Sequence, residues 1–388
     1  MYIGLSVSIQ HKEGEKMRNL YKIGIPIGAI AVIVASVFTY QYISTTQAQQ
    51  TITLNGAGAT FPFPLIDKWI AEYYKIKQNT QINYQSIGSG GGIRQYTVKT
   101  VDFGATDAPL TEEQFANATN TLHIPETIGG VVPTYNLPDI ASGLKFSGAV
   151  LSDIFLGKIT KWNDTQLQAL NPSANLPSQD IIVVHRSDGS GTTFVLTNYL
   201  SDVSSEWRTT VGKSTSVNWP TGLGGKGNEG VAGLVSQNPY SIGYVEFIYA
   251  KNNNLPWGYV QNAVGEFVEP SLQSFAAASS AAAVTLPSGD QSWSTVSIVD
   301  SIVNNTQATE AYPITSFTYL LVYKELNVVP NMNKDKANAL VQFLWWAIHD
   351  GQDYSSDLAY VPLPQSVTTN AEATIRMITF NGEQLYTG

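Results

Sequence analysis

A strand, a glycine-containing loop and a helix are predicted in succession between Ile181 and Leu200. The run 181–184 (IIVV) has the β-branched side chains of a buried strand, and residues 192–200 carry apolar side chains at helical spacing. Where a strand turns through glycines into a helix, the first helical N–H groups lack partners, and these groups together with the helix dipole attract an anion. The loop 186–192 (RSDGSGT) therefore predicts a site for an oxyanion.

The side chains of this loop strengthen the anion interpretation. Arg186 can bind an oxyanion with two parallel hydrogen bonds, and Ser190 and Thr192 add hydroxyl donors. Asp188 is close enough in sequence to hold the guanidinium of Arg186 in a fixed orientation. The alternative is that DGSG is only a turn followed by a helix cap, which is the more common role of such strings.

The same order of strand, loop and helix recurs near the start of the chain. The predicted strands lie at 51–54, 81–86 and 101–106, and each is followed by a loop and a predicted helix. Repeated units of this kind indicate an α/β fold with a mostly parallel sheet, in which ligands collect beyond the carboxyl ends of the strands. Four loops could meet there. The extended apolar stretch 128–136 is a plausible crossing between two lobes.

The first 50 residues predict a membrane anchor. Residues 1–22 contain Lys12, Lys16, Arg18 and Lys22, and 23–43 are almost wholly apolar and uncharged, which is about 30 Å of helix. The positive flank predicts a cytoplasmic N-terminus, with the rest of the chain outside. We expect an uncleaved anchor followed by a polar tether at 44–50, although cleavage after Ala48 and a start at Met17 stay open.

Composition excludes several classes of function. The chain has no cysteine, which rules out disulfides, thiolate metal sites and a cysteine nucleophile. Its four histidines are scattered, so no metal site is expected. The string 222–227 matches the glycine pattern of dinucleotide-binding proteins, but no strand is predicted before it, so no cofactor is expected. A formal charge of −9 without a basic run beyond the first residues argues against nucleic acid as a partner. A chain of this charge must bind an anion with local donors and dipoles.

Asp107 is an unexpected residue among anion-binding loops, because a carboxylate repels an anion. Its usual role in such a position is to cap a helix or turn. Phosphate near neutral pH keeps at least one proton, whereas sulfate keeps none. A buried carboxylate at Asp107 could therefore accept a hydrogen bond from phosphate and repel sulfate.

Five segments together resemble the phosphate-binding protein of ABC-type phosphate importers. The resemblance extends in order from about Leu54 to Pro364, and its segments are 56–62 (GAGATFP), 101–109 (VDFGATDAP), 186–192 (RSDGSGT), 224–228 (GGKGN) and 242–246 (IGYVE). It implies a two-lobed periplasmic-binding-protein-like fold of type II, in which each lobe is a mainly parallel sheet flanked by helices. The ligand lies in the cleft between the lobes, which close about a hinge. The first lobe would comprise 51–136 and 316–388, and the second 137–315.

The resemblance also implies a set of phosphate contacts. They are Thr60 and Phe61, mainly through backbone N–H groups, and Ser89, Asp107, Arg186, Ser190, Gly191 and Thr192. Asp107 would accept the phosphate proton, and Asp188 would orient Arg186. The chain departs from the family pattern at Ser89-Gly90, where two serines are common, at Thr106, which replaces a common serine, and at His185.

We therefore expect a non-enzymatic receptor outside the cytoplasm that delivers inorganic phosphate to the permease and ATPase subunits of an ABC importer. The N-terminal segment suggests tethering to the membrane, as in archaeal relatives, and a monomer is expected. Three alternatives stay open: a secreted phosphatase-like protein on the same scaffold, a receptor for another oxyanion, and an adhesive surface protein. A phosphatase needs a nucleophile or metals, and no such cluster is visible in the sequence.

Overall fold

The computed structural model describes residues 51–282 and 285–386. The predicted cytoplasmic segment, membrane anchor and tether at 1–50 lie outside the described residues. Residues 51–388 form one compact structural unit. Within the described ranges, no helix is both long enough and apolar enough to cross a bilayer.

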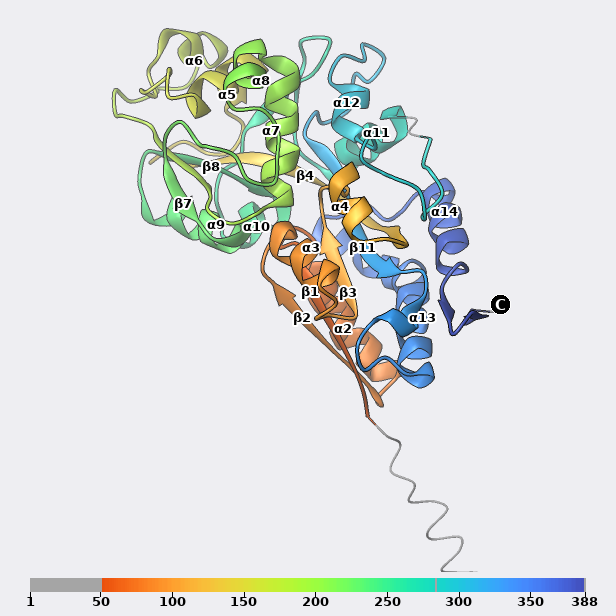
Figure 1. The fold of residues 1–388 in the computed structure, drawn as a ribbon. Coiled ribbons are helices and arrows are strands. Elements are labelled where there is room, and N and C mark those ends of the chain that lie inside the picture. Colours follow the sequence, from red (N-terminus) through yellow and green to blue (C-terminus); the bar gives the residue numbers. More distant parts are fainter. Residues whose placement is uncertain (1–50, 283–284, 387–388) are drawn as a thin grey trace, which may run out of the picture. The chain divides into compact units, whose positions relative to one another are not determined.

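The described part is an α/β structure built on one sheet of eight strands (Figure 1). In spatial order the strands are β2 (Thr80–Ser86), β1 (Ile52–Gly58), β3 (Phe103–Thr106), β11 (Thr315–Tyr323), β4 (Thr121–Asn136), β8 (Ser241–Glu246), β6 (Ile182–Arg186) and β7 (Leu223–Gly225). Two small sheets are formed by β5 (Lys145–Phe146), β9 (Tyr259–Gln261) and β10 (Phe267–Val268), and by β12 (Thr379–Phe380) and β13 (Glu383–Gln384). The predicted α/β class is confirmed.

The sheet contains two sets of parallel strands that run in opposite directions. β1, β2 and β3 are parallel to one another, and so are β6, β7 and β8. The two sets are joined by β11 and β4, and each step from β3 through β11 and β4 to β8 is antiparallel. Three reversals make the two sets run in opposite directions. We call the part around β1–β3 the first lobe and the part around β6–β8 the second lobe.

β4 belongs to both lobes. Its first part, 121–130, pairs with β11, and its second part, 131–136, pairs with β8. Figure 1 shows this long strand passing from the first lobe into the second. The predicted crossing at 128–136 is therefore part of a continuous strand, and the antiparallel pair β4 and β11 makes the whole sheet mixed. The predicted lobe boundaries at 136 and 315 stay a prediction.

Helices cover the sheet, and those at 63–76, 89–97, 112–117 and 191–203 follow the loops of the predicted strand–loop–helix units. The first lobe contributes α2 (Phe63–Ile76), α3 (Ser89–Thr97) and α4 (Glu112–Asn117), and the second contributes α5 (Gly148–Phe155), α6 (Thr165–Leu170), α7 (Gly191–Val203), α8 (Ser205–Thr210), α9 (Gly227–Gln237) and α10 (Phe247–Asn252). The remaining helices are α11 (Leu272–Ala282), α12 (Ile298–Ile302), α13 (Lys334–Ala347) and α14 (Gln365–Ile375), with short 3-10 turns η1 (Leu326–Val328), η2 (Asp350–Tyr354) and η3 (Ser356–Leu358).

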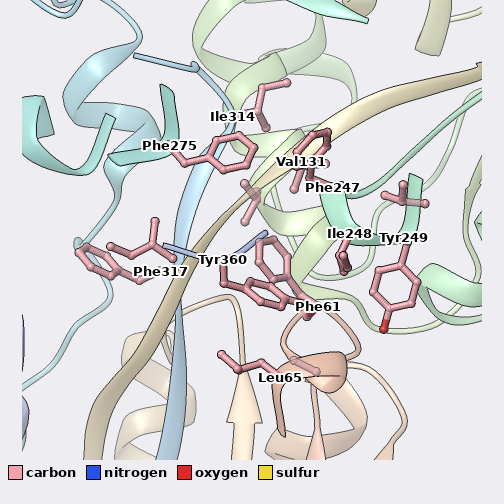
Figure 2. Packing of buried hydrophobic residues seen from close by; sticks show 14 of the residues in the cluster. Phe61, Leu65, Val131, Phe247, Ile248, Tyr249, Phe275, Ile314, Phe317 and Tyr360 are labelled. Atoms are coloured by element: carbon pink, nitrogen blue, oxygen red, sulfur yellow. Dashed lines mark hydrogen bonds between the residues drawn. The ribbon is translucent and has the colours of Figure 1, made fainter. Parts of the chain in front are cut away.

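Apolar side chains from both lobes pack around the middle of β4 (Figure 2). Phe61 and Tyr360 lie on the first-lobe side, and the rings of Phe247 and Phe275 meet edge to face with centroids 5.6 Å apart. Val131 of β4 is itself fully buried among them. Each such side chain contributes about 1.5–3 kcal/mol when it is removed from water. One hydrophobic core therefore extends beneath the loops of both lobes. This shared core holds the loops of the two lobes next to each other.

Candidate functional site

The carboxyl ends of the two opposed strand sets bring the predicted contact residues into one region. Thr60 and Phe61 follow β1, Ser89 begins α3 after β2, and Asp107 follows β3. From the other side, Arg186 ends β6, and Ser190, Gly191 and Thr192 form the start of α7. All eight residues are buried, and even the long side chain of Arg186 is only 3% exposed. The four loops predicted to converge do so.

The two lobes contact each other through these loops. The N–H of Gly90 donates to the carbonyl of Gly189 at 2.9 Å, so the start of α3 touches the loop before α7. The hydroxyl of Tyr249 donates to the carbonyl of Thr60 at 2.6 Å. Gly191 lies directly against Asp107, because a Cβ at position 191 would collide with the carboxylate. The structure is thus one in which the cleft is closed.

Arg186 and Asp188 form a two-pronged ion pair. The Nε of Arg186 donates to Oδ1 of Asp188 at 2.8 Å, and Nη2 donates to Oδ2 at 2.5 Å. Burial alone would raise the pKa of Asp188, but the hydrogen bonds and charge of Arg186 lower it overall. This pairing uses one edge of the guanidinium, formed by Nε and Nη2, and leaves Nη1 free to donate elsewhere. Nη1 donates to the hydroxyl oxygen of Thr192 at 3.3 Å. Asp188 orients Arg186 in the way the sequence predicts.

Asp107 is a buried acid with an unpaired oxygen. Its Oδ2 lies 3.5 Å from the hydroxyl of Ser89, whereas Oδ1 has no hydrogen-bond partner within 51–282 and 285–386. Burial raises the pKa of Asp107 to about 8, although the guanidinium of Arg186 and the hydroxyl of Ser89 lower it. The carboxyl therefore holds a proton below pH 8 and loses it above. Oδ1 can accept a hydrogen bond when the carboxyl is ionised and can donate one when it is protonated. Asp107 can therefore pair with a protonated or an unprotonated oxygen of a ligand, depending on pH.

The start of α7 combines a helix cap with a close backbone approach. The hydroxyl of Ser190 accepts the N–H of Thr193 at 3.0 Å, which is the usual cap of a helix N-terminus. The oxygen of Ser190 is thus used by the helix, and its hydrogen is left for a ligand. Gly191 leaves no room for a side chain against the first lobe, so the backbone of α7 reaches the site directly. The structure confirms that DGSG is a turn with a helix cap, and its role as an anion site stays a prediction.

Phe61 occupies its predicted place but not through its ring. The side chain is fully buried and lies 6.4 Å from the ring of Tyr360, centroid to centroid. The carbonyl of Phe61 accepts the hydroxyl of Tyr360 at 2.6 Å. Only the backbone of Phe61 is therefore available to a ligand, and the contact that the resemblance implies stays a prediction.

Three residues of the site were not predicted. Asn228 contacts both Thr60 and Thr192, and Tyr249 fixes the carbonyl of Thr60. Asn228 lies in the recognised segment 224–228, which could have drawn attention to it, but nothing local indicates its partners. Glu126 is fully buried in β4 near Asp107, and burial raises its pKa to about 8. Glu126 could have been noticed in the sequence because it is the one acidic residue in the largely apolar stretch 121–136.

A cavity of about 550 Å³ lies beside the Arg186–Asp188 pair. It is lined by residues of both lobes: Ile87, Gly90, Gly91, Arg94, Gln95, Asp188, Gly189 and Lys226. Arg94 and Lys226 are exposed cations. Positive charge at this position raises the local concentration of an anionic ligand. Within the described ranges, no group of three or more metal-ligating side chains occurs.

Comparisons with known proteins agree with this architecture. A family model described as a PBP superfamily domain matches residues 44–348. The phosphate-binding protein PstS of Pasteurella multocida is 48% identical over 344 residues, covering 88% of this chain and 94% of that protein. PstS of Methanocaldococcus jannaschii is 39% identical and covers 86% and 88% of the two chains.

Solved structures give the same fold at low identity. A high-affinity periplasmic phosphate-binding protein (PfluDING), solved with bound phosphate, superposes with a TM-score of 0.63 at 18% identity. The match covers 83% of this chain and 93% of that one, and at this identity it concerns the fold alone. The two-lobed fold predicted from the sequence is confirmed. By the family model and by its identity to these relatives over most of its length, the chain belongs to the PBP superfamily and, within it, to the PstS family of phosphate-binding proteins.

Proposed function

We propose that this chain is an extracytoplasmic receptor that binds inorganic phosphate in the closed cleft and delivers it to an ABC importer. The relatives named PstS support the ligand and the transport role. The observation that carries the proposal is the composition of the site: hydroxyls, the start of α7 and the guanidinium of Arg186 lie around the buried acid Asp107, one oxygen of which has no partner among the described residues. This combination fits an oxyanion that itself carries a proton.

The proposed contacts are those predicted from the sequence. Thr60 and Phe61 would bind the ligand from the first lobe together with Ser89 and Asp107. Arg186 would bind it from the second lobe, together with the start of α7, which supplies Ser190, Gly191 and Thr192. Charge-assisted hydrogen bonds contribute about 1.5–3 kcal/mol each, and a micromolar ligand requires about 8 kcal/mol, so a few of them suffice. The protein would act by binding and release, without chemistry on the ligand.

Closure is the proposed signal to the importer. Because ligand groups come from both lobes, an anion between them stabilises the closed form over an open one. Only the closed form would present both lobes to the permease in register. We further propose that residues 23–43 anchor the chain, with residues 51–388 outside the cell, and that the receptor acts as a monomer. Recovery of the intact N-terminus with the membrane fraction supports the anchor, and a mature chain that starts after Ala48 contradicts it.

Titration calorimetry with phosphate, and then with sulfate, tests the ligand. We expect one phosphate per chain, with micromolar or tighter affinity, and much weaker binding of sulfate above pH 8, where the carboxyl of Asp107 is ionised. Arg186→Ala should abolish high-affinity binding, because the site loses its cation. Lys161→Ala is the matched control, since Lys161 forms an exposed ion pair with Asp180 and should leave affinity unchanged. Near-normal phosphate affinity in Arg186→Ala contradicts the site assignment.

A further inference from the structure

Asn228 connects the two lobes at the centre of the site. It is the second residue of α9 and is fully buried. Its Nδ2 lies 2.8 Å from the hydroxyl oxygen of Thr60 in the first lobe and 3.2 Å from that of Thr192 in the second. One amide group therefore donates to the hydroxyls of two residues that the resemblance places at the ligand.

The backbone fixes which way the amide faces. The N–H of Glu246 donates to Oδ1 of Asn228 at 3.0 Å. A backbone N–H can only donate, so the oxygen of the amide must lie on this side and the NH₂ group must face the two threonines. Both hydrogens of the NH₂ group then have acceptors, one in each lobe.

This arrangement decides the role of the Thr60 hydroxyl. Its oxygen accepts two hydrogen bonds, from Nδ2 of Asn228 at 2.8 Å and from the backbone N–H of the same residue at 3.2 Å. A hydroxyl oxygen has two lone pairs, and both are occupied here. Among the described residues, no acceptor is bound to the hydroxyl hydrogen. The hydroxyl of Thr60 is left only as a donor.

The hydroxyl of Thr192 is constrained in the same way. Its oxygen accepts from Nδ2 of Asn228 and from Nη1 of Arg186, the latter at 3.3 Å. Within the ranges 51–282 and 285–386, it too has no acceptor for its own hydrogen. A free hydroxyl can rotate and either donate or accept, but these two cannot accept without losing a buried partner.

We propose that Asn228 is a positioning residue that turns the hydroxyls of Thr60 and Thr192 into obligate donors and thereby restricts the cleft to ligands that present acceptors to both lobes. This inference rests on the proposed function, because the ligand is the oxyanion named there. Asn228 itself does not touch the ligand. It favours an anion by preparing both hydroxyls before binding, so that no reorientation is needed when the ligand arrives.

Substitutions at position 228 test this role through the order of their affinities for phosphate. Asn228→Ala removes the amide and frees both hydroxyls, and we expect phosphate to bind about tenfold more weakly. Asn228→Asp keeps the size and the acceptor for Glu246, but its second oxygen accepts from the threonines and repels the ligand. We expect this variant to bind at least about a hundredfold more weakly than wild type, that is, more weakly than Asn228→Ala.

A role in packing alone predicts the reverse order, because aspartate fills the space of asparagine and alanine does not. An affinity of Asn228→Asp equal to or above that of Asn228→Ala overturns the inference. Asn136→Asp is the matched control: its amide donates to carbonyls at the far end of α9, and phosphate affinity should not change. Wild-type protein is titrated first, and its failure to bind phosphate refutes the proposed function rather than the role of Asn228.

A double-mutant cycle decides the question even if Asn228→Asp does not fold. Thr60→Val removes the hydroxyl and keeps the shape of the side chain. If Asn228 acts through that hydroxyl, the affinity loss in Thr60→Val combined with Asn228→Ala is clearly smaller than the product of the two single losses. Losses that multiply within about twofold contradict the proposal. Thermal unfolding without phosphate verifies that each variant is folded.

Discussion

The acid at position 107 predicts a pH-dependent choice between phosphate and sulfate. Burial raises the pKa of Asp107 to about 8 in the closed cleft, and its Oδ1 has no partner among the described residues. Below this pKa the carboxyl is protonated and can donate to a fully ionised anion. Above it, the carboxylate can only accept and repels sulfate. We therefore expect wild-type protein to lose sulfate affinity as pH rises through 8.

The magnitude follows from the proton balance. If sulfate requires the protonated form of Asp107, its dissociation constant scales with 1 + 10^(pH − 8), which predicts an increase of about tenfold between pH 7 and pH 9. Phosphate retains a proton across this range and can donate it to the ionised carboxylate, so its affinity should change much less. The preference for phosphate over sulfate should therefore increase by about tenfold between these two values.

Asp107→Asn supplies the comparison. An amide cannot change its charge, so the pH dependence of sulfate binding should disappear. The variant should also bind sulfate more tightly than wild type at pH 9, and it should bind phosphate about tenfold or more weakly, because one charge-assisted hydrogen bond is lost. Calorimetry with each anion at pH 7, 8 and 9 measures all of these. Sulfate affinity that does not vary with pH in wild type, or that varies equally in Asp107→Asn, refutes the reasoning.

Three further predictions concern residues around the site. Burial raises the pKa of Glu126 to about 8, so this acid stabilises the folded state most at low pH, and the stabilisation is lost as pH rises toward 8. In urea titrations, Glu126→Gln should reduce the fall in unfolding free energy between pH 5 and pH 7 by about 2.5 kcal/mol. A fall that is the same in the variant and in wild type contradicts this prediction. Gly191→Ala should weaken phosphate binding by at least about tenfold while the protein still melts cooperatively, because its Cβ would meet Asp107; normal affinity contradicts the close approach. Replacement of Arg94 and Lys226 by alanine should slow phosphate association severalfold in low salt but not in about 0.5 M salt, and a salt-independent effect would exclude electrostatic attraction.

The sequence predicted the parts of the site that depend on local geometry. A strand that ends at Arg186, a glycine loop and a helix that begins at Gly191 are adjacent in the chain, so their combination can be inferred from spacing. The pairing of Arg186 with Asp188 spans two residues and was predicted for the same reason. Repeated strand–loop–helix units also predict that the carboxyl ends of the strands lie at one edge of the sheet, and the loops that follow these strands meet there.

Contacts between distant segments could not be predicted in this way. Asn228 and Thr60 are 168 residues apart, and their hydrogen bond depends on how the two lobes close. The central pair β4 and β11 is antiparallel, but an apolar run has the same composition in either direction. Glu126 lies where the register of this pair shifts between Thr318 and Tyr319, and such a bulge can turn a side chain toward a functional site. Glu126 is buried like every other residue of β4 from 121 to 135, so its burial follows from the central place of this strand in the sheet.

The charges around the cleft explain how a chain with a net charge of −9 can bind an anion. Three carboxyls, those of Asp107, Glu126 and Glu246, are buried here, and burial raises the pKa of each. For Asp107 and Glu126 the pKa rises to about 8, so that these two are mostly uncharged at pH 7. The charge of Arg186 is largely matched by Asp188. A bound ligand is therefore held by oriented donors: the guanidinium edge, the N-terminus of α7 and hydroxyls that are held by Asn228. The exposed cations Arg94 and Lys226 act on the approach of the ligand. Because the oriented donors act over short distances, they favour an anion that fits between the lobes and do not require a positive protein.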